Sequence, residues 1–168
     1  MSNSLPEPWL RGPIEGVAPH VLPVFHSFAQ VREDLARHTE GLTTEDVWRQ
    51  TGALAPLGFH LRHIAHSVDR LVTYLFSGEL SADQITILKQ EAAPGATLQD
   101  LLTEIDAKLN DAEEKLREIS PASLNEPRWV GKKRLPTTVL GLLVHVTEHT
   151  QRHLGQAITT AKLARETR

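Results

Sequence analysis

Residues 54–77 carry apolar side chains in an alternating four–three spacing, which restricts the folds open to this chain more than any other feature. The spaced positions are Leu57, Leu61, Ile64, Val68, Leu71 and Leu75. At about 100° per residue, this spacing places all of them on one face of an α-helix. Such a face is stable only when neighbouring helices cover it. The segment therefore predicts a long helix inside a helical bundle.

Three further long segments show helical periodicity. They cover residues 20–41, the stretch from an expected cap at Thr97 to just before Pro121, and residues 137–163. Capping-box patterns predict two short helices, one following Thr43 and a minor one following Ser81. The chain has neither an internal repeat nor an alternating strand–helix pattern. The fold class is therefore all-α, a four-helix bundle with a short minor helix.

The chain has 168 residues, a length typical of one domain. Residues 1–16 contain three prolines and two glycines, so we expect an extended N-terminal arm there and a single bundle domain over residues 17–168. Residues 121–137 interrupt the helices. The residues around Gly131-Lys132 allow a small hairpin or a crossing loop before the last helix.

Composition excludes several kinds of partner and chemistry. With 18 basic and 21 acidic residues and a net charge of −3, we expect no nucleic-acid or anionic-membrane partner. The N-terminal residues lack the pattern of a signal peptide and no membrane-spanning run occurs, so we expect a cytoplasmic location. The chain has no cysteine, which excludes disulfides, thiolate ligands and a cysteine nucleophile.

Histidine is unusually frequent, with nine in the chain. Six of them fall in two short windows, His60, His63 and His66 in one and His145, His149 and His153 in the other. Both windows lie on expected long helices, one on the second and one on the fourth. The two clusters are therefore the place to look for function.

On the fourth helix, His153 lies inside the apolar stripe, within roughly 40° of its centre, and His149 lies on its flank. His145 points further out, at roughly 120°. Because residues four apart are neighbours on a helix, His149 and His153 can reach one metal ion at about 2.0–2.1 Å.

On the second helix, His60 lies closest to the apolar seam, at roughly 60°, and His63 lies at roughly 120°. His66 is nearly opposite the seam and is expected in solvent. Periodicity alone thus favours His60 as the inward histidine. A bundle helix has a wide contact face, however, so His63 stays open as the alternative.

The residues allow two interpretations, a histidine metal centre and a set of hydrogen-bonded core and surface histidines. The His-Glu-x-x-His pattern of zinc proteases is absent. Paired Glu-x-x-His motifs are absent too, which argues against a ferritin-like di-iron bundle.

Two segments resemble the DinB-like family of metal-binding four-helix bundles: Gly58-Phe-His-Leu-Arg-His63-Ile-Ala-His-Ser67 and Glu148-His149-Thr-Gln-Arg-His153-Leu-Gly-Gln156. The family has one histidine ligand before a hydrophobic-Ala pair, and a His-x3-His pair whose last member precedes x-Gly-Gln. The resemblance therefore implies His63, His149 and His153 as ligands, with His60 as the substitute for His63. His66 and His145 have no role in that pattern.

Three histidine ligands leave a coordination position open, as in catalytic metal sites. The resemblance implies one divalent transition metal, zinc or nickel first and manganese or iron next. It also implies a thiol-dependent S-transferase that joins a low-molecular-weight thiol to a small electrophile, and a homodimer. The alternatives are a metal-dependent hydrolase that uses bound hydroxide and a non-catalytic, stress-associated bundle that binds metal or a small ligand. No catalytic residue beyond the ligands is identified.

Overall fold

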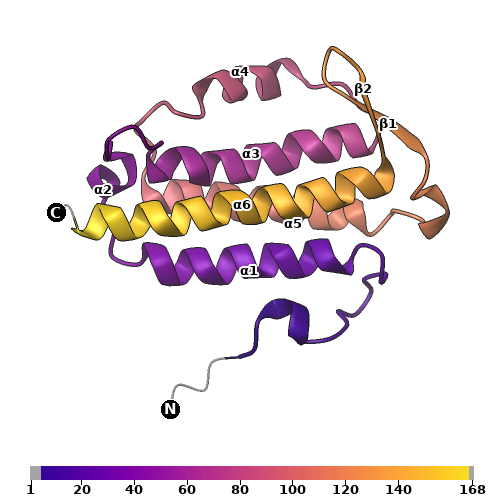
Figure 1. The fold of residues 1–168 in the computed structure, drawn as a ribbon, viewed down its shortest axis with the longest axis horizontal. Helices are drawn as coiled ribbons and strands as arrows, with labels where there is room; N and C mark the ends of the chain where they lie inside the picture. The colour runs from indigo at the N-terminus through magenta and orange to yellow at the C-terminus, as the bar shows by residue number, and fades with distance from the viewer. Residues whose placement is uncertain (1–4, 167–168) are drawn as a thin grey trace.

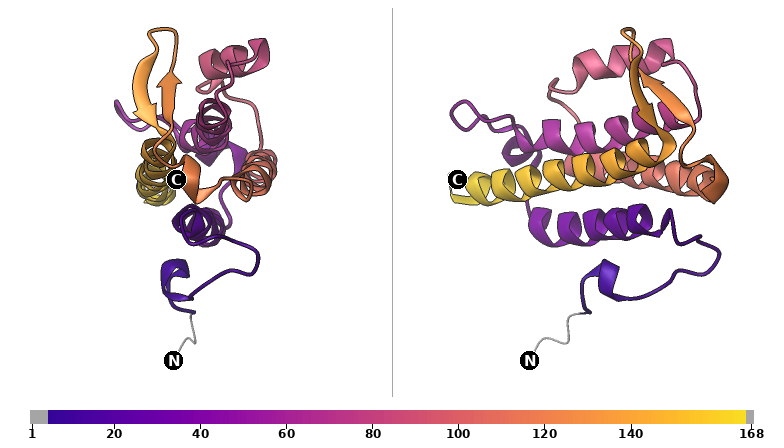
Figure 2. Two further views of the ribbon diagram at one scale, coloured as in Figure 1. Left: turned by 90° about the vertical axis from the view of Figure 1, so that its right-hand side faces the viewer. Right: turned by 45° about the vertical axis from the view of Figure 1, so that its right-hand side comes forward.

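The computed structural model describes residues 5–166. Four long helices run side by side and form the bundle (Figure 1): α1 (Leu22–Thr39), α3 (Leu57–Leu75), α5 (Leu98–Leu116) and α6 (Val139–Glu166). In the end-on view of Figure 2 they occupy the corners of a square, with α3 opposite α1 and α5 opposite α6. The all-α bundle is confirmed.

The direction of each helix follows from the short elements between them. The short helix α2 (Thr44–Trp48) joins α1 to α3, while α4 (Ala82–Gln90) runs back along the outside of α3 (Figure 1). Consequently α5 starts beside the start of α3, and these two helices are parallel. A contact between residues at similar distances from the two helix starts shows this: Lys108 Nζ on α5 lies 3.3 Å from Asp69 Oδ1 on α3.

The caps that the sequence predicts are present. Thr43, Ser81 and Thr97 each form a capping box with the residue three positions later. In each, the hydroxyl accepts a hydrogen bond from a backbone N–H of the first turn, and the later side chain accepts one from the cap residue's own N–H. These local hydrogen bonds fix where α2, α4 and α5 begin.

The hairpin before the last helix is confirmed, with a wider turn than expected. Strand β1 (Pro127–Val130) pairs antiparallel with β2 (Leu135–Thr138), and Val130 is opposite Leu135. The turn therefore spans four residues rather than Gly131-Lys132 alone. Both of its end residues are left-handed, Gly131 at φ 68° and Arg134 at φ 48°. The Arg134 guanidinium lies over the Trp129 ring at 4.9 Å, a cation–π contact across the hairpin.

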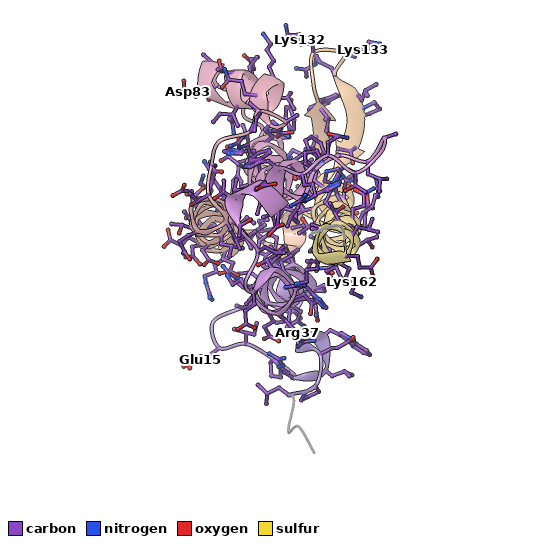
Figure 3. All side chains as sticks on the ribbon, turned by 90° about the vertical axis from the view of Figure 1, so that its left-hand side faces the viewer. Glu15, Arg37, Asp83, Lys132, Lys133 and Lys162 are labelled. Atoms are coloured by element: carbon purple, nitrogen blue, oxygen red, sulfur yellow. The ribbon has the colours of Figure 1, made fainter. Side chains whose placement is uncertain are left out.

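The apolar seam of α3 lies in the core, as its spacing predicts. Five of its six residues are at most 2% exposed, and Leu71 is 9% exposed. Charged side chains project outward instead, among them Asp83 on α4 and Lys132 and Lys133 at the hairpin tip (Figure 3). None of the helices in the described part of the chain combines the length and apolar character needed to cross a bilayer.

The residues before α1 follow its outer side. A 3-10 turn, η1 (Pro8–Leu10), lies beside α1, and the Arg11 guanidinium pairs with the Glu33 carboxylate of that helix through two hydrogen bonds, the longer of 2.8 Å. At the other end of the chain, α6 begins at Val139 and not at Thr137, because Thr137 and Thr138 still belong to β2.

Candidate metal centre

Three histidines from α3 and α6 meet between these two antiparallel helices. The Nε2 atoms of His63 and His149 lie 2.9 Å apart, and the ring of His153 lies 4.2 Å from that of His63, centroid to centroid. One ligand nitrogen of each histidine lies within 4.8 Å of the other two, and all three residues are half-buried. The structure thus brings together the set implied by the family resemblance.

The donor set suits a transition metal. Two nitrogens that each bind one ion at about 2.0–2.1 Å can lie no more than about 4.2 Å apart. The separation of 2.9 Å between His63 and His149 satisfies this limit, and the ligand nitrogen of His153 lies within 4.8 Å of both. Neutral imidazoles are suitable ligands for zinc, nickel and iron.

Hydrogen bonding fixes the tautomer of His63. Its Nδ1 lies 2.7 Å from Oε2 of Glu91, the residue that follows α4. An ionised carboxylate only accepts hydrogen bonds, so Nδ1 carries the proton and donates it. The Nε2 lone pair of a neutral His63 is therefore directed at His149.

His149 then cannot satisfy both of its ring nitrogens within the protein. Its Nδ1 is buried and has no hydrogen-bond partner. If the proton is on Nδ1, a buried donor is unsatisfied and two Nε2 lone pairs face each other; if it is on Nε2, a buried acceptor is unsatisfied. A cation held between the two Nε2 atoms removes the repulsion between their lone pairs. The residues present therefore fit a metal ion.

The surroundings keep two of the three histidines unprotonated. Burial, followed by electrostatic repulsion from His63, lowers the pKa of His149 and of His153 to about 4. Burial alone would raise the pKa of Glu91, but hydrogen bonds from His63 and Arg70 lower it overall, so this carboxylate stays ionised. At neutral pH the site therefore offers metal-binding lone pairs beside one buried negative charge.

These shifts predict how the stability of the metal-free protein depends on pH. In the unfolded chain, His149 and His153 take up protons near pH 6.5, whereas in the folded chain they do so near pH 4. The unfolded state therefore binds more protons within this range, and the free energy of unfolding falls as the pH falls from about 6.5 to 4. Urea unfolding in the presence of a chelator measures it, and the His149→Ala/His153→Ala variant should show a flatter dependence. An equally steep dependence in both proteins would contradict the prediction.

His60 is buried at 6% exposure, as its place near the apolar seam predicts, yet it lies to one side of the three convergent nitrogens. Its Nδ1 is 3.3 Å from Nδ1 of His153. Phe59 stacks on the ring of His63, with the two ring centroids 5.4 Å apart. His60 is thus a neighbour of the triad, and the assignment of His63 as the ligand stays a prediction.

The other clustered histidines lie outside the group. The expectation that His66 lies in solvent is wrong, because it is only 3% exposed and its Nε2 lies 2.8 Å from Oε1 of Glu104 on α5. The helix α3 has α5 and α4 beside it as well as α6, so a side chain opposite the seam is still enclosed. His145 is at the surface as expected, with Nδ1 2.7 Å from Oε1 of Glu148.

Sequence reasoning missed Glu91, which is 3% exposed and touches His63. This residue follows a short helix in which none of the residues is buried, and no local pattern marks it. Arg70 lies seven residues after His63 on α3. It donates a 2.7 Å hydrogen bond to Oε1, the other carboxylate oxygen of Glu91. That helical spacing places Arg70 near His63, but it does not reveal the shared carboxylate.

Fold and site together define a class: a four-helix bundle in which histidines of two helices could hold one divalent metal ion. The sequence model of the DinB superfamily matches residues 27–157, which include His63, His149 and His153. The chain therefore belongs to the DinB superfamily, as its two histidine segments indicate. A search of curated proteins finds no match to it.

Proposed function

We propose that this protein is a divalent-metal enzyme that transfers a low-molecular-weight thiol to a small electrophilic molecule. The observation that carries the proposal is the convergence of three half-buried imidazoles, two of them with a pKa near 4, on one point between α3 and α6. Membership of the DinB superfamily supports it. Zinc or nickel is the metal we propose, with manganese or iron as alternatives.

His63, His149 and His153 hold the ion in this proposal. Such an ion supplies a Lewis acid that lowers the pKa of a coordinating thiol. Three protein ligands leave room for an exchangeable one, as in catalytic zinc sites and unlike closed structural ones. The three side chains are half-buried rather than enclosed, as a site open to a small molecule requires.

The chain's own residues restrict the chemistry further. It has no cysteine, so the sulfur nucleophile has to come from a cosubstrate. Phe59 covers one side of His63, and its ring also meets that of His60 edge-on at 5.3 Å. The Phe59 ring is thus an apolar group beside the proposed ligands, which suits a substrate with an apolar part.

A conjugation assay tests the proposal. The protein, stripped of metal and reloaded with Zn²⁺ or Ni²⁺, is mixed with glutathione, coenzyme A or mycothiol and a chromogenic electrophile such as 1-chloro-2,4-dinitrobenzene. We expect conjugation that depends on both metal and thiol, and the His149→Ala/His153→Ala variant should react only at the background rate.

Other outcomes of the same assay point to the alternatives. Turnover of 4-nitrophenyl acetate without thiol, abolished by chelation, would indicate a metal-dependent hydrolase instead. A fully loaded protein that is inactive with every thiol and ester would overturn the proposed transfer and leave a non-catalytic binding bundle.

A further inference from the structure

Glu91 connects the candidate metal centre to a separate part of the fold. Its carboxylate is almost fully buried, and its two oxygens have different partners. Oε2 accepts from Nδ1 of His63, and Oε1 accepts from the Arg70 guanidinium, each at 2.7 Å. His63 and Arg70 belong to α3, whereas Glu91 directly follows α4.

We propose that Glu91 is a positioning residue, which holds His63 in the tautomer and orientation that bind metal and thereby couples metal binding to the placement of α4. The proposal rests on the metal site of the proposed function. Histidine ligands commonly donate their second N–H to a carboxylate, which orients the ring and increases its basicity.

The ion pair alone does not account for this arrangement. A buried carboxylate needs compensation for its lost hydration, and Arg70 supplies the opposite charge. If that were its whole role, any donor could satisfy the buried Oε2, including a second N–H of the same guanidinium. Instead Oε2 accepts from the one ring nitrogen of His63 that faces away from His149. The contact leaves Nε2 free to face the other two histidines.

The segment that carries Glu91 is attached to the bundle mainly by polar contacts. None of the residues of α4 is buried. At its start, the Gln84 amide donates hydrogen bonds to Asp69 Oδ2 and Thr73 Oγ1 of α3, at 2.8 and 2.9 Å. Few apolar contacts therefore hold α4 in place. If metal binding strengthens the hydrogen bond between His63 and Glu91, the local stability of α4 should change measurably.

At the end of α4, side-chain contacts define the path of the chain. The Arg62 guanidinium donates to the carbonyls of Gln90 and Ala93, at 3.1 and 2.7 Å, and lies 5.1 Å from the centre of the Trp48 ring. That ring packs where Gly58 has no side chain, since a Cβ there would lie 2.7 Å from it. These contacts of Arg62 and Trp48 thus position Glu91 beside His63.

A second histidine–carboxylate pair that involves α3 provides a matched control for substitution of Glu91. His66 and Glu104 form another histidine–carboxylate pair, with a separation of 2.8 Å, between α3 and α5. His66 is not one of the three convergent histidines. The Glu104→Gln variant therefore removes the same charge from the same kind of contact without touching a proposed ligand.

The first test measures Zn²⁺ affinity by competition with a fluorescent chelator at constant pH. We expect Glu91→Gln to bind Zn²⁺ about 10- to 100-fold more weakly than the parent, and Glu104→Gln to bind as the parent does. Glu91→Asp keeps the charge for Arg70 but is too short to reach both partners, so a similar loss is expected. Circular dichroism of the metal-free variants verifies that each is folded.

The second test uses hydrogen–deuterium exchange. Adding Zn²⁺ should slow amide exchange in peptides covering residues 82–97 of the parent and of Glu104→Gln, and this protection should be lost in Glu91→Gln. Equal affinity of the parent and both Glu91 variants would overturn the positioning role, and unchanged exchange in the zinc-bound parent would overturn the coupling. A parent that binds no Zn²⁺ would instead contradict the proposed function.

Discussion

The His149→Ala/His153→Ala double variant is expected to retain no metal after it is loaded with Zn²⁺ and desalted. The parent, loaded with Zn²⁺ and desalted, should retain one ion per chain, because its three nitrogens already lie within 4.8 Å of one another. With two of them removed, His63 alone cannot compete with water and buffer for the ion. Elemental analysis of both desalted proteins measures the difference.

His60→Ala is the control for this prediction. His60 contacts His153 but is not among the three convergent residues, so the variant should keep its ion while His63→Ala should lose it. The reverse result would make His60 the α3 ligand. An ion retained by the double variant, or a parent that retains none after loading, would show that the histidine triad is not a metal site.

Leu61→Ala is expected to cause a large loss of stability. Leu61 is fully buried in the seam of α3, and its replacement leaves a cavity that the packed neighbours fill only in part. Substitutions of this kind lower the free energy of unfolding by about 2–5 kcal/mol. For a chain of this length, the midpoint of thermal unfolding should fall by about 4–20 °C. Calorimetry of the metal-free protein measures this change.

The matched control is Leu88→Ala. Leu88 is 45% exposed on α4, and truncation at such a position should change the free energy of unfolding by no more than about 0.5 kcal/mol. Equal losses from Leu61→Ala and Leu88→Ala would mean that the bundle interior is not packed as described. The ligands of Leu61→Ala are intact, so below its melting temperature it should still bind Zn²⁺.

Much of the fold can be predicted from the sequence because the signals are local. The four–three spacing on α3 marks the buried face of a helix whatever its neighbours are, and five of its six positions are essentially inaccessible to solvent. Capping boxes need only residues three apart, so Thr43, Ser81 and Thr97 mark three helix starts correctly. The turn of the hairpin is longer than the sequence suggests, because the amino-acid sequence does not specify the left-handed backbone of Arg134.

The candidate metal site also has one part that the local sequence predicts and one part that it does not. His149 and His153 are one helical turn apart, and a single helix therefore determines that both can reach one point. The choice between His60 and His63 depends on how α3 faces α6, which periodicity cannot give. Resemblance implied His63, and packing brings this residue to the pair.

The sequence by itself determined the helices, their buried faces and the histidine pair on α6, because each depends on residues within a few positions of one another. Only the tertiary structure decided that α5 encloses His66, and that Glu91 of a distant segment reaches His63 across 28 positions of the chain. Contacts of that kind depend on how rigid helices pack together. No short-range pattern records them.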